Sequence, residues 1–317
     1  MTEFELIRRF FTPRTSHTVL AGGDDAALIA VTPGFELAVS TDMLISGRHF
    51  FENAEPYGIG HKSLAVNLSD LAAMGARPGW ATLSLALPQA DADWLERFSL
   101  GFLELARAYD VDLIGGDTTR GPLAICVQIM GEVAAGKALR RSGARAGDDL
   151  WVSGTLGDAA IGLAHLHGDF ELRAHDRDYA LKRLDLPQPR VALGQALLGI
   201  ATGAIDISDG LVADVGHVAE ASGVRAVIEW ESVPLSSAAG PNRQHPFVQR
   251  CALAGGDDYE LAFTAPSSAR QVLGRLGAKL GLAVTRIGHV EAGEGVVVLD
   301  KAGKPLVLPE TGFDHFR

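Results

Sequence analysis

The sequence predicts an α+β protein of two domains, and its length, its composition and the order of its local patterns lead to that class. With 317 residues, the chain is long enough for two domains of ordinary size. Hydrophobic residues make up 47% of it, charged residues make up 21%, and the mean hydropathy is +0.14. These values exclude a disordered or fibrous protein. Helical and strand-like segments are interleaved irregularly, which favours α+β layers over one doubly wound sheet.

In the N-terminal part of the chain, apolar residues recur with helical spacing in three segments. They predict helices over residues 3–11, 57–74 and 91–109. Short apolar runs predict strands over residues 37–40, 82–87, 111–114 and 123–129. The segment 134–149 is rich in Gly, Ala and charged residues and has no periodic apolar face, so we place the domain boundary there, between domains 1–137 and 138–317.

The C-terminal part continues the alternation of helices and strands. Helical patterns lie over residues 158–167, 189–201, 211–221 and 267–280. Strand-like runs lie over residues 150–153, 224–228, 259–264, 284–290 and 295–299.

Charge and cysteine content exclude several classes of function. The chain has 28 basic and 39 acidic side chains, a net charge of −11, which argues against a surface built for nucleic acid or anionic lipid. Cys126 and Cys251, the two cysteines, lie in apolar runs and are predicted to be buried free thiols rather than a disulfide or a zinc site. Acidic residues near the N-terminus and the lack of an 18-residue apolar stretch predict a cytoplasmic protein without a membrane segment.

The tripeptide Gly-Gly-Asp occurs three times, at residues 22–24, 115–117 and 255–257. Glycine allows the backbone to approach a ligand closely, and a carboxylate binds a hard cation through oxygen. An ordinary turn explains any one copy equally well, but three copies next to strand-like runs favour a binding site.

Two further groups of oxygen-bearing side chains lie at the ends of predicted elements. Ser40, Thr41 and Asp42 end the strand at 37–40. Asp206, Ser208 and Asp209 precede the helix at 211–221, where either Ser208 or Asp209 would serve as an N-cap, or the helix N-terminus would bind a phosphate.

The helix at 57–74 is mostly apolar but carries one polar stripe. Ser63, Asn67 and Asp70 recur at spacings of four and three residues and therefore lie on one face. An exposed helix face usually carries Lys and Glu, whereas these short side chains favour a confined polar cavity.

Common catalytic signatures are absent from the sequence. There is no Gly-x-x-x-x-Gly-Lys-Ser/Thr loop, no Gly-x-Ser-x-Gly elbow, no protein-kinase motif set and no His-Glu-x-x-His pair. The remaining candidates are carboxylates, glycine turns and a few arginines. Oxygen ligands of this kind suit Mg²⁺, and Mg²⁺ held by few carboxylates usually accompanies phosphates, so the chemistry indicated is phosphoryl transfer.

Taken together, these motifs resemble the thiamine-monophosphate kinase family over nearly the whole chain. The matching strings are Gly-Asp-Asp-Ala-Ala at 23–27, Ser-Thr-Asp at 40–42, Asn-Leu-Ser-Asp-Leu-Ala-Ala-Met-Gly at 67–75, Ile-Gly-Gly-Asp-Thr-Thr at 114–119, Asp-Ile-Ser-Asp-Gly at 206–210 and Gly-Gly-Asp-Asp-Tyr-Glu-Leu at 255–261. The ending Gly-Phe-Asp-His-Phe at 312–316 is also similar to that of the family.

The resemblance implies an enzyme that uses ATP to phosphorylate thiamine monophosphate, giving thiamine diphosphate and ADP by direct in-line transfer with several Mg²⁺ ions. It implies an N-terminal α/β domain with a mixed sheet, which binds ATP and metal and pairs in a homodimer, and a C-terminal α+β domain. Aminoimidazole ribonucleotide synthetase and selenophosphate synthetase share this fold. Whether a monovalent cation such as K⁺ is needed stays open.

The resemblance also implies a role for each matching residue. The implied metal ligands are Asp25, Ser40, Thr41, Asp42, Asp70, Asp117, Asp206 and Asp209, of which Asp42, Asp117 and Asp209 are the expected catalytic residues. The implied ATP contacts are Gly116, Asp117, Arg141 and Ser208, with Tyr109 as a further candidate. The implied contacts to the thiamine substrate are His49, Asp257 and Phe313.

Two positions depart from the pattern of the family. Asp257 stands where Glu is common, so its carboxylate is one methylene shorter. Phe313 stands where Tyr or Trp is also usual, and it can stack on a ring but cannot donate a hydrogen bond.

Two alternative functions stay open from the sequence. One is another ATP-dependent synthetase of the same superfamily; selenophosphate synthetase carries a reactive Cys near its N-terminus, and this chain has none before Cys126. The other is a protein that binds nucleotide or metal as a sensor, without turnover.

Overall fold

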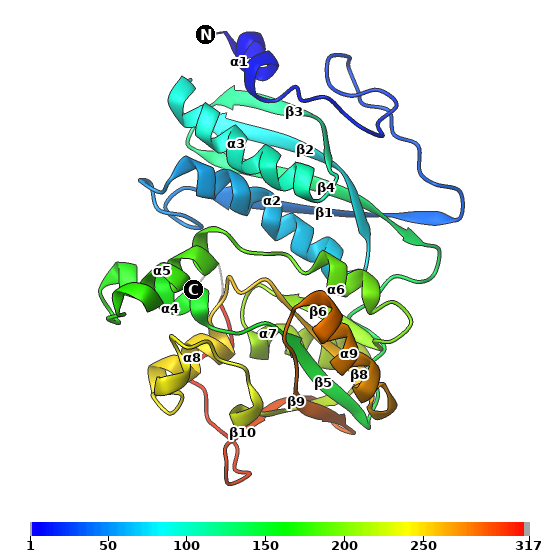
Figure 1. Cartoon of the computed structure of the whole chain (residues 1–317), viewed down its shortest axis with the longest axis vertical. Helices are drawn as coiled ribbons and strands as arrows, with labels where there is room; N and C mark the ends of the chain where they lie inside the picture. The colour runs from blue at the N-terminus through cyan, green and yellow to red at the C-terminus, as the bar shows by residue number, and fades with distance from the viewer. Residues whose placement is uncertain (1, 314–317) are drawn as a thin grey trace. The chain divides into compact units, whose positions relative to one another are not determined.

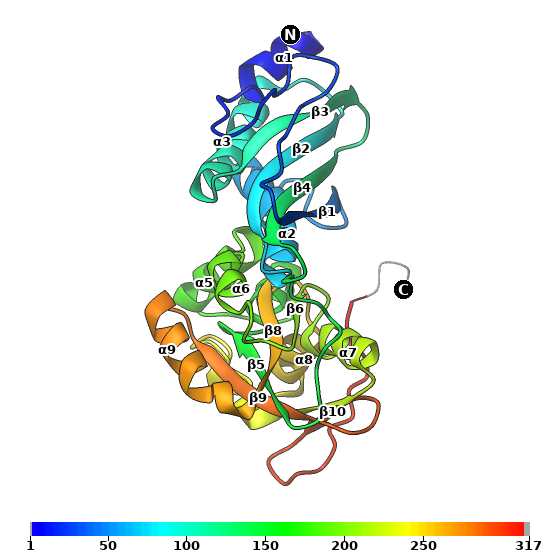
Figure 2. The ribbon, with the colours of Figure 1, turned by 90° about the vertical axis from the view of Figure 1, so that its right-hand side faces the viewer.

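A computed structural model describes residues 2–313 and divides the chain into two compact units. The N-terminal unit consists of Met1–Leu71 and Ala76–Gly136, and the C-terminal unit of Ala72–Gly75 and Lys137–Arg317. Figures 1 and 2 show each unit as a sheet with helices packed against it. Each unit combines helices with a sheet that contains both parallel and antiparallel strands, which confirms the predicted α+β class.

The N-terminal unit is built on a four-stranded sheet in the order β1-β4-β2-β3. Its strands are β1 (Phe35–Ile45), β2 (Arg77–Leu87), β3 (Asp112–Arg120) and β4 (Ala124–Ala134). Strands β2 and β3 are parallel, whereas β4 is antiparallel to both β1 and β2. The helices are α1 (Glu3–Phe10), α2 (Pro56–Ala73) and α3 (Ala92–Ala108). Strands β1 and β3 are therefore the two edges of this sheet.

Helices α2 and α3 lie against the same face of this sheet (Figure 1). Leu64 and Leu68 of α2 are fully buried, as are Phe98 and Phe102 of α3. The two helices approach closely at Gly60, where a Cβ atom would stand 2.0 Å from the carbonyl oxygen of Phe98. A side chain at this position would push the helices apart, so glycine is required there.

The C-terminal unit contains a six-stranded sheet in the order β10-β7-β9-β5-β8-β6. Its strands are β5 (Asp148–Ser153), β6 (Gly203–Ile207), β7 (Arg225–Glu229), β8 (Glu260–Pro266), β9 (Val284–Glu291) and β10 (Gly295–Leu299). Only β10 and β7 pair in parallel. The helices are α4 (Asp158–His167), α5 (Ala174–Asp185), α6 (Val191–Ala196), α7 (Leu211–Ser222), α8 (Pro246–Ala254) and α9 (Arg270–Leu280), with 3₁₀ turns η1 (Trp230–Ser232), η2 (Gly240–Asn242) and η3 (Ser267–Ala269).

The core of the C-terminal unit lies under strands β5 and β6. Every residue of both strands is buried, and Leu150, Ile207 and Trp230 belong to one apolar cluster with α7. Strand β6 is an edge of the sheet, so the loop that follows it reaches the surface of the unit.

Three elements of the C-terminal unit were not predicted from the sequence. Helix α5 contains Asp176, Arg177, Asp178, Lys182 and Arg183, so it lacks a clear apolar period. Helix α8 and strand β6 are nine and five residues long, which is too short for a strong pattern.

Both cysteines are free, with Cys251 buried and Cys126 half-buried. Across residues 2–313, no helix is long and apolar enough to cross a membrane.

Candidate active site

In the N-terminal unit, strand β1 and helix α2 bring two predicted carboxyl groups together. The Ser40 hydroxyl donates a hydrogen bond to Asp70, and the carboxyl groups of Asp42 and Asp70 also share a hydrogen bond. Ser40 and Asp42 point to the same face because side chains alternate along a strand. The helix stripe and the Ser-Thr-Asp triplet, predicted separately from the sequence, therefore meet through Asp70.

The environment of Asp42 favours its neutral form. Burial raises the pKa of Asp42 to about 7, and the neighbouring charge and hydrogen bond of Asp70 act in the same direction. Two carboxyl groups in contact repel each other when both are ionised. A divalent cation between them would remove that repulsion, and a site of this kind at neutral pH is a candidate for metal binding.

The rest of the polar stripe of α2 does not reach this group. Ser63 and Asn67 are buried, and they hydrogen-bond to the carbonyl oxygens of Gly60 and Ser63 within the helix. The side-chain oxygen of Asn67 has no hydrogen-bond partner within residues 2–313. The burial of Ser63 and Asn67 agrees with the predicted confined setting of the stripe, but of its three residues only Asp70 is seen to contact the cluster on β1.

Gly116 and Asp117 lie on β3, at the opposite edge of the same sheet. Gly116 has a φ of +150°, and a Cβ atom there would stand 1.8 Å from the carbonyl oxygen of Leu83, so only glycine fits. Asp117 is exposed next to it. Gly22, in the loop that carries Asp25, passes beside the same strand, with its Cβ position 3.7 Å from the carbonyl oxygen of Ile114.

The two acidic groups of the N-terminal unit are far apart within one chain. Asp42 pairs with Val127 of β4, Val127 with Leu83 of β2, and Leu83 with Gly116 of β3. Three strand spacings separate β1 from β3, which is about 14 Å. Asp42 and Asp117 of one chain therefore cannot bind the same magnesium ion, whose bonds to oxygen are about 2.1 Å long.

In the C-terminal unit, the loops at 206–210 and 255–259 are joined through their backbones. The amide of Asp257 donates to the carbonyl of Ser208 at 2.9 Å, and that of Tyr259 donates to Ile207 at 2.8 Å. Asp257 and Tyr259 have φ values of 68° and 50°, a conformation that side chains other than glycine rarely adopt. The Tyr259 hydroxyl also donates to the Asp257 carboxylate at 2.9 Å.

The loop at 206–210 is held by a residue that the sequence analysis missed. The buried carboxylate of Asp214 accepts the amides of Ser208, Asp209 and Gly210 at 3.0, 3.1 and 3.1 Å. Burial raises the pKa of Asp214 to about 6, and the charge of Asp209 adds to this, while the three hydrogen bonds oppose it. In the sequence, Asp214 is an aspartate in the first turn of a helix whose other first-turn residues are apolar, and this feature could have identified it.

This arrangement corrects one interpretation of the α7 N-terminus. The helix begins after Gly210, which has no side-chain cap, so an N-cap role for Ser208 or Asp209 is wrong. The amides of Ser208, Asp209 and Gly210 bind Asp214, whereas the binding of a phosphate by the first amides of the helix stays a prediction.

Two more predicted residues border the same loop. The amide of Phe313 donates to the carbonyl of Asp209 at 2.9 Å, and its side chain is 48% exposed. The chain before Arg141 pairs with β6, since Ala204 donates to the carbonyl of Arg140 at 2.9 Å, which places the exposed Arg141 beside the strand that carries Asp206.

Two family models match this chain and cover most of its length. "AIR synthase related protein, N-terminal domain" matches residues 23–133, and "AIR synthase related protein, C-terminal domain" matches residues 145–301. The thiamine-monophosphate kinase of Escherichia coli K12 is 45% identical over 318 aligned residues, covering 99% of this chain and 98% of the relative. The chain belongs to the thiamine-monophosphate kinase family. The family member of Bacillus subtilis is 37% identical over the full length of both chains.

Solved structures of the thiamine-monophosphate kinase family share this fold. The enzyme from Stenotrophomonas maltophilia K279a is 48% identical, with a TM-score of 0.86 over 92% of each chain. The structure "AaThiL complexed with AMPPCP and TMP" is 35% identical, with a TM-score of 0.78 over 90% of this chain and 89% of that one. Hydrogenase maturation proteins HypE, 21–23% identical, share the fold alone.

The residues predicted from the thiamine-monophosphate kinase motifs thus fall into three groups. Asp42, Asp70 and Ser40 form a cluster, and Thr41 lies beside them on β1; Asp25, Gly116 and Asp117 lie at or near the β3 edge; and Asp206, Ser208, Asp209, Asp257 and Phe313 lie on joined segments of the C-terminal unit. His49 follows β1, where its Nδ1 accepts the amide of Ile45 at 3.0 Å. Within residues 2–313, no three His, Cys, Asp or Glu side chains are grouped closely enough to hold a metal ion by themselves.

Proposed function

We propose that this chain transfers the terminal phosphoryl group of ATP to the phosphate of thiamine monophosphate, giving thiamine diphosphate and ADP. Identities of 37–45% over essentially the full length of thiamine-monophosphate kinases support this activity. A related structure that holds both AMPPCP and TMP supports the pair of substrates. The observation in this chain that carries the proposal is the contact between the carboxyl groups of Asp42 and Asp70, beside the hydroxyl group of Ser40.

The reaction needs charge compensation rather than a general base. A phosphate monoester has a second pKa near 6, so at pH 7 the acceptor is largely a dianion and is already nucleophilic. ATP and the acceptor together carry roughly six negative charges, counted from about −1.5 to −2 per terminal phosphate plus the inner phosphates. The main barrier is therefore the repulsion between two anions.

The residues of the N-terminal unit fit magnesium by their chemistry. Ser40, Asp42 and Asp70 offer only oxygen atoms, and Mg²⁺ typically takes one or two carboxylates with phosphate oxygens and water. This explains why no cluster of three carboxylates is required. Bound magnesium would neutralise the phosphates and hold the reacting oxygens in line. We propose that several magnesium ions are bound, with ligands drawn from Asp25, Ser40, Thr41, Asp42, Asp70 and Asp117 in the N-terminal unit and from Asp206 and Asp209 in the C-terminal unit. A requirement for K⁺ is a separate proposal.

The contacts to ATP follow from the backbone geometry and the charges of each unit. Gly116 and Asp117 are both exposed on β3, an edge strand of the sheet. In the C-terminal unit, Arg141 supplies a positive charge and Ser208 a hydroxyl. We propose these four residues as ATP contacts, with Asp42, Asp117 and Asp209 as the catalytic carboxylates.

The thiamine part of the substrate requires aromatic and polar contacts. Phe313 lies on a segment bonded to Asp209, about half of its side chain is exposed, and an aromatic ring can stack on the rings of the substrate. Tyr259 holds the Asp257 carboxylate in place, and the strained backbone at both residues fixes that orientation. We propose that Phe313, Asp257 and His49 contact the substrate, with the fixed Asp257 standing in for the longer Glu of other family members.

A homodimer would bring the two distant acidic groups together. Strands β1 and β3 are both open edges of one sheet, and Val39 and Met43 of β1 are 53% and 55% exposed. When the β1 edge of one copy lies beside the β3 edge of the other, Asp42 of each copy approaches Asp117 of its partner. We propose this pairing, with two composite sites related by symmetry.

A coupled assay of ADP release tests the proposed function against its alternatives. Thiamine monophosphate, thiamine and an aminoimidazole ribonucleotide precursor are supplied in parallel with ATP and Mg²⁺. The proposal predicts ADP release with thiamine monophosphate only. Turnover of another acceptor indicates a different synthetase, and binding of ATP without ADP release indicates a sensor.

A further inference from the structure

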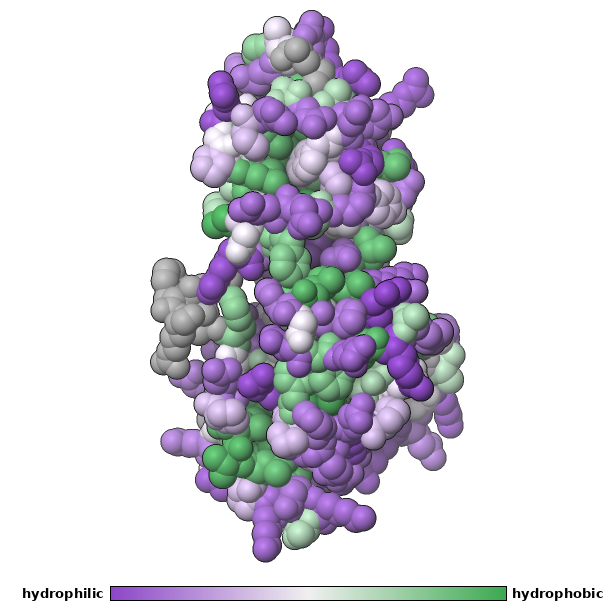
Figure 3. Space-filling model, turned by 90° about the vertical axis from the view of Figure 1, so that its left-hand side faces the viewer, coloured by the Kyte–Doolittle hydropathy of each residue, from purple (hydrophilic) through white to green (hydrophobic). Residues whose placement is uncertain are grey.

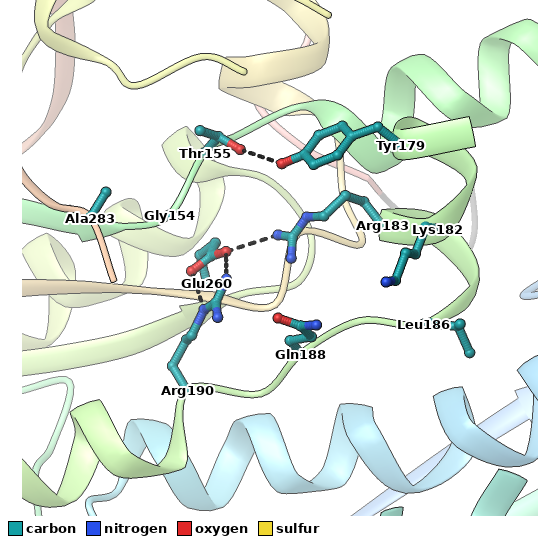
Figure 4. Close-up of a pocket in the computed structure, with 10 residues that line it drawn as sticks. All are labelled: Gly154, Thr155, Tyr179, Lys182, Arg183, Leu186, Gln188, Arg190, Glu260 and Ala283. Atoms are coloured by element: carbon teal, nitrogen blue, oxygen red, sulfur yellow. Dashed lines mark hydrogen bonds and ion pairs between the residues drawn. The ribbon is translucent and has the colours of Figure 1, made fainter. Parts of the chain in front are cut away.

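A pocket with charged side chains in its wall lies in the C-terminal unit, outside the residues proposed for phosphoryl transfer. It has a volume of about 280 Å³ and is lined by the end of β5, helix α5, the connection from α5 to α6 and the start of β8. Figure 4 shows Arg183 of α5 and Arg190 of this connection bonded to Glu260, with Lys182 of α5 lining the same pocket. None of these four side chains has a role in the mechanism proposed above.

The pocket wall carries more positive than negative charge. Glu260 is completely buried; it accepts hydrogen bonds from Arg183 at 2.8 Å, from the Nε of Arg190 at 2.6 Å and from the Ser153 hydroxyl at 2.5 Å. The side chains of Arg183 and Arg190 are only 11% and 15% exposed. Two guanidinium groups thus share one carboxylate, and a buried charge without a counter-charge is costly.

Two further carboxyl groups near the pocket are bonded to neutral donors. Asp158 is bonded to the hydroxyls of Thr155, at 2.6 Å, and Ser236, and Asp258 accepts the Gly157 amide with both oxygens at 2.9 Å. Neither Asp158 nor Asp258 lines the pocket, whose charged lining residues are Lys182, Arg183, Arg190 and Glu260. The exposed Lys182 thus adds a further positive charge to that of the arginine pair.

The pocket also has an unpartnered donor beneath its wall, a side-chain amide and an apolar surface. The Nε of Arg183 has no hydrogen-bond partner among the described residues, although it is buried. Gln188 presents an amide to the cavity, while Leu186 and Ala283 provide apolar surface. A volume of about 280 Å³ is just below the range for drug-sized ligands, roughly 300–1,000 Å³, and therefore suits a small molecule.

We propose that this pocket binds a small organic phosphate at a site separate from the phosphoryl-transfer site. A phosphate monoester carries a charge of about −1.5 to −2, which matches the excess of one charge from the arginine pair and one from Lys182. Guanidinium groups suit phosphate oxygens because of their planar, forked donors. The apolar wall favours a phosphate with a small organic body over inorganic phosphate. This inference goes beyond the proposed kinase activity and does not depend on it.

Phenyl phosphate is a suitable probe, and phenol is its uncharged counterpart. Isothermal titration calorimetry on the full chain, in EDTA so that magnesium-dependent binding is removed, is expected to show one phenyl phosphate bound per chain and no phenol binding. Lys182→Glu reverses a charge at the pocket rim and is expected to weaken binding at least tenfold. Lys301→Glu makes the same charge change at an exposed position outside the pocket and is expected to leave binding unchanged. Gln188→Ala, which keeps every charge, provides a second variant with an expected weakening of several fold.

Three results would overturn the proposal. Equal binding of phenol and phenyl phosphate would show that charge is not recognised. Equal weakening by Lys182→Glu and Lys301→Glu would show only the effect of overall charge. Loss of phenyl phosphate binding in Phe313→Ala, a variant of the proposed substrate site, would assign the binding to that site. Because the readout is binding without turnover, failure of the kinase assay would leave this test unaffected.

Discussion

Phe313 shows how one exposed side chain could select the substrate. Its amide is bonded to the carbonyl of Asp209, while about half of its surface stays open. We predict that Phe313→Ala raises the KM for thiamine monophosphate about threefold to tenfold, which corresponds to the loss of one aromatic stacking contact, and leaves the KM for ATP unchanged. Steady-state kinetics with each substrate varied in turn checks this. Phe4→Ala removes another exposed ring and serves as the control. An equal rise in both KM values would mean that Phe313 only packs.

Asp149 provides a prediction of pH dependence at the scale of a single residue. Hydrogen bonds from Arg270, at 2.6 and 2.7 Å, lower the pKa of Asp149 most, burial opposes them, and Arg286 adds a bond at 2.8 Å. Since the folded state prefers the charged form, this stabilisation is complete above the ordinary pKa of about 3.9 and is lost as the pH falls below it.

We therefore predict that Asp149→Asn lowers the free energy of unfolding by about 2 kcal/mol at pH 7, a value reduced because Arg270 is half exposed. Below pH 4 the difference from the wild type shrinks. Urea unfolding at pH 3, 5 and 7 measures it, with the exposed Glu220→Gln as the control. A difference that stays constant across this range would contradict the assignment of the pH effect to Asp149.

At the scale of elements, α7 holds the loop that precedes it. The Asp214 carboxylate accepts three backbone amides of that loop, which in turn bonds to the segments carrying Asp257 and Phe313. We predict that Asp214→Ala lowers the free energy of unfolding by about 2–4 kcal/mol because buried amides lose their acceptor. Asp214→Asn keeps an accepting oxygen and should cost less. Thermal and urea unfolding compare the two variants. An alanine variant as stable as the wild type would show that the hydrogen bonds of Asp214 do not stabilise the fold.

Helices and strands with a clear apolar repeat could be predicted from the sequence. The others depend on contacts with distant parts of the chain. Helix α2 was found because its apolar residues repeat over 18 positions, whereas α5, with its charged surface, was not. Asp42 and Asp70 were both identified from local patterns. Asp214 looks in sequence like an ordinary residue of a helix, and its role depends on a loop that folds back onto it. The order of strands, which separates Asp42 from Asp117, cannot be read from local patterns at all.

At the scale of the whole molecule, the proposed dimer has a direct genetic test. Asp42→Asn and Asp117→Asn are each predicted to be inactive as homodimers. In a mixed dimer with composite sites, one site receives both substitutions and the other receives neither. Co-expression should restore about a quarter of the wild-type activity, since half the dimers are mixed and each of these has one intact site. Light scattering confirms the oligomeric state. Activity that is not restored, in a protein shown to form mixed dimers, would place Asp42 and Asp117 in separate sites.

The central claim is that carboxylates around Asp42 gather magnesium so that two anions can react. Phosphorus NMR of a mixture of ATP, thiamine monophosphate and Mg²⁺ tests it most directly, because it follows both products at once. We predict equal amounts of ADP and thiamine diphosphate with the wild type and a rate at least about 100-fold lower with Asp42→Asn, with unfolding unchanged. Glu36→Gln, an exposed change on the same strand, should react as the wild type does. ADP without thiamine diphosphate, or an undiminished rate in Asp42→Asn, would contradict the account.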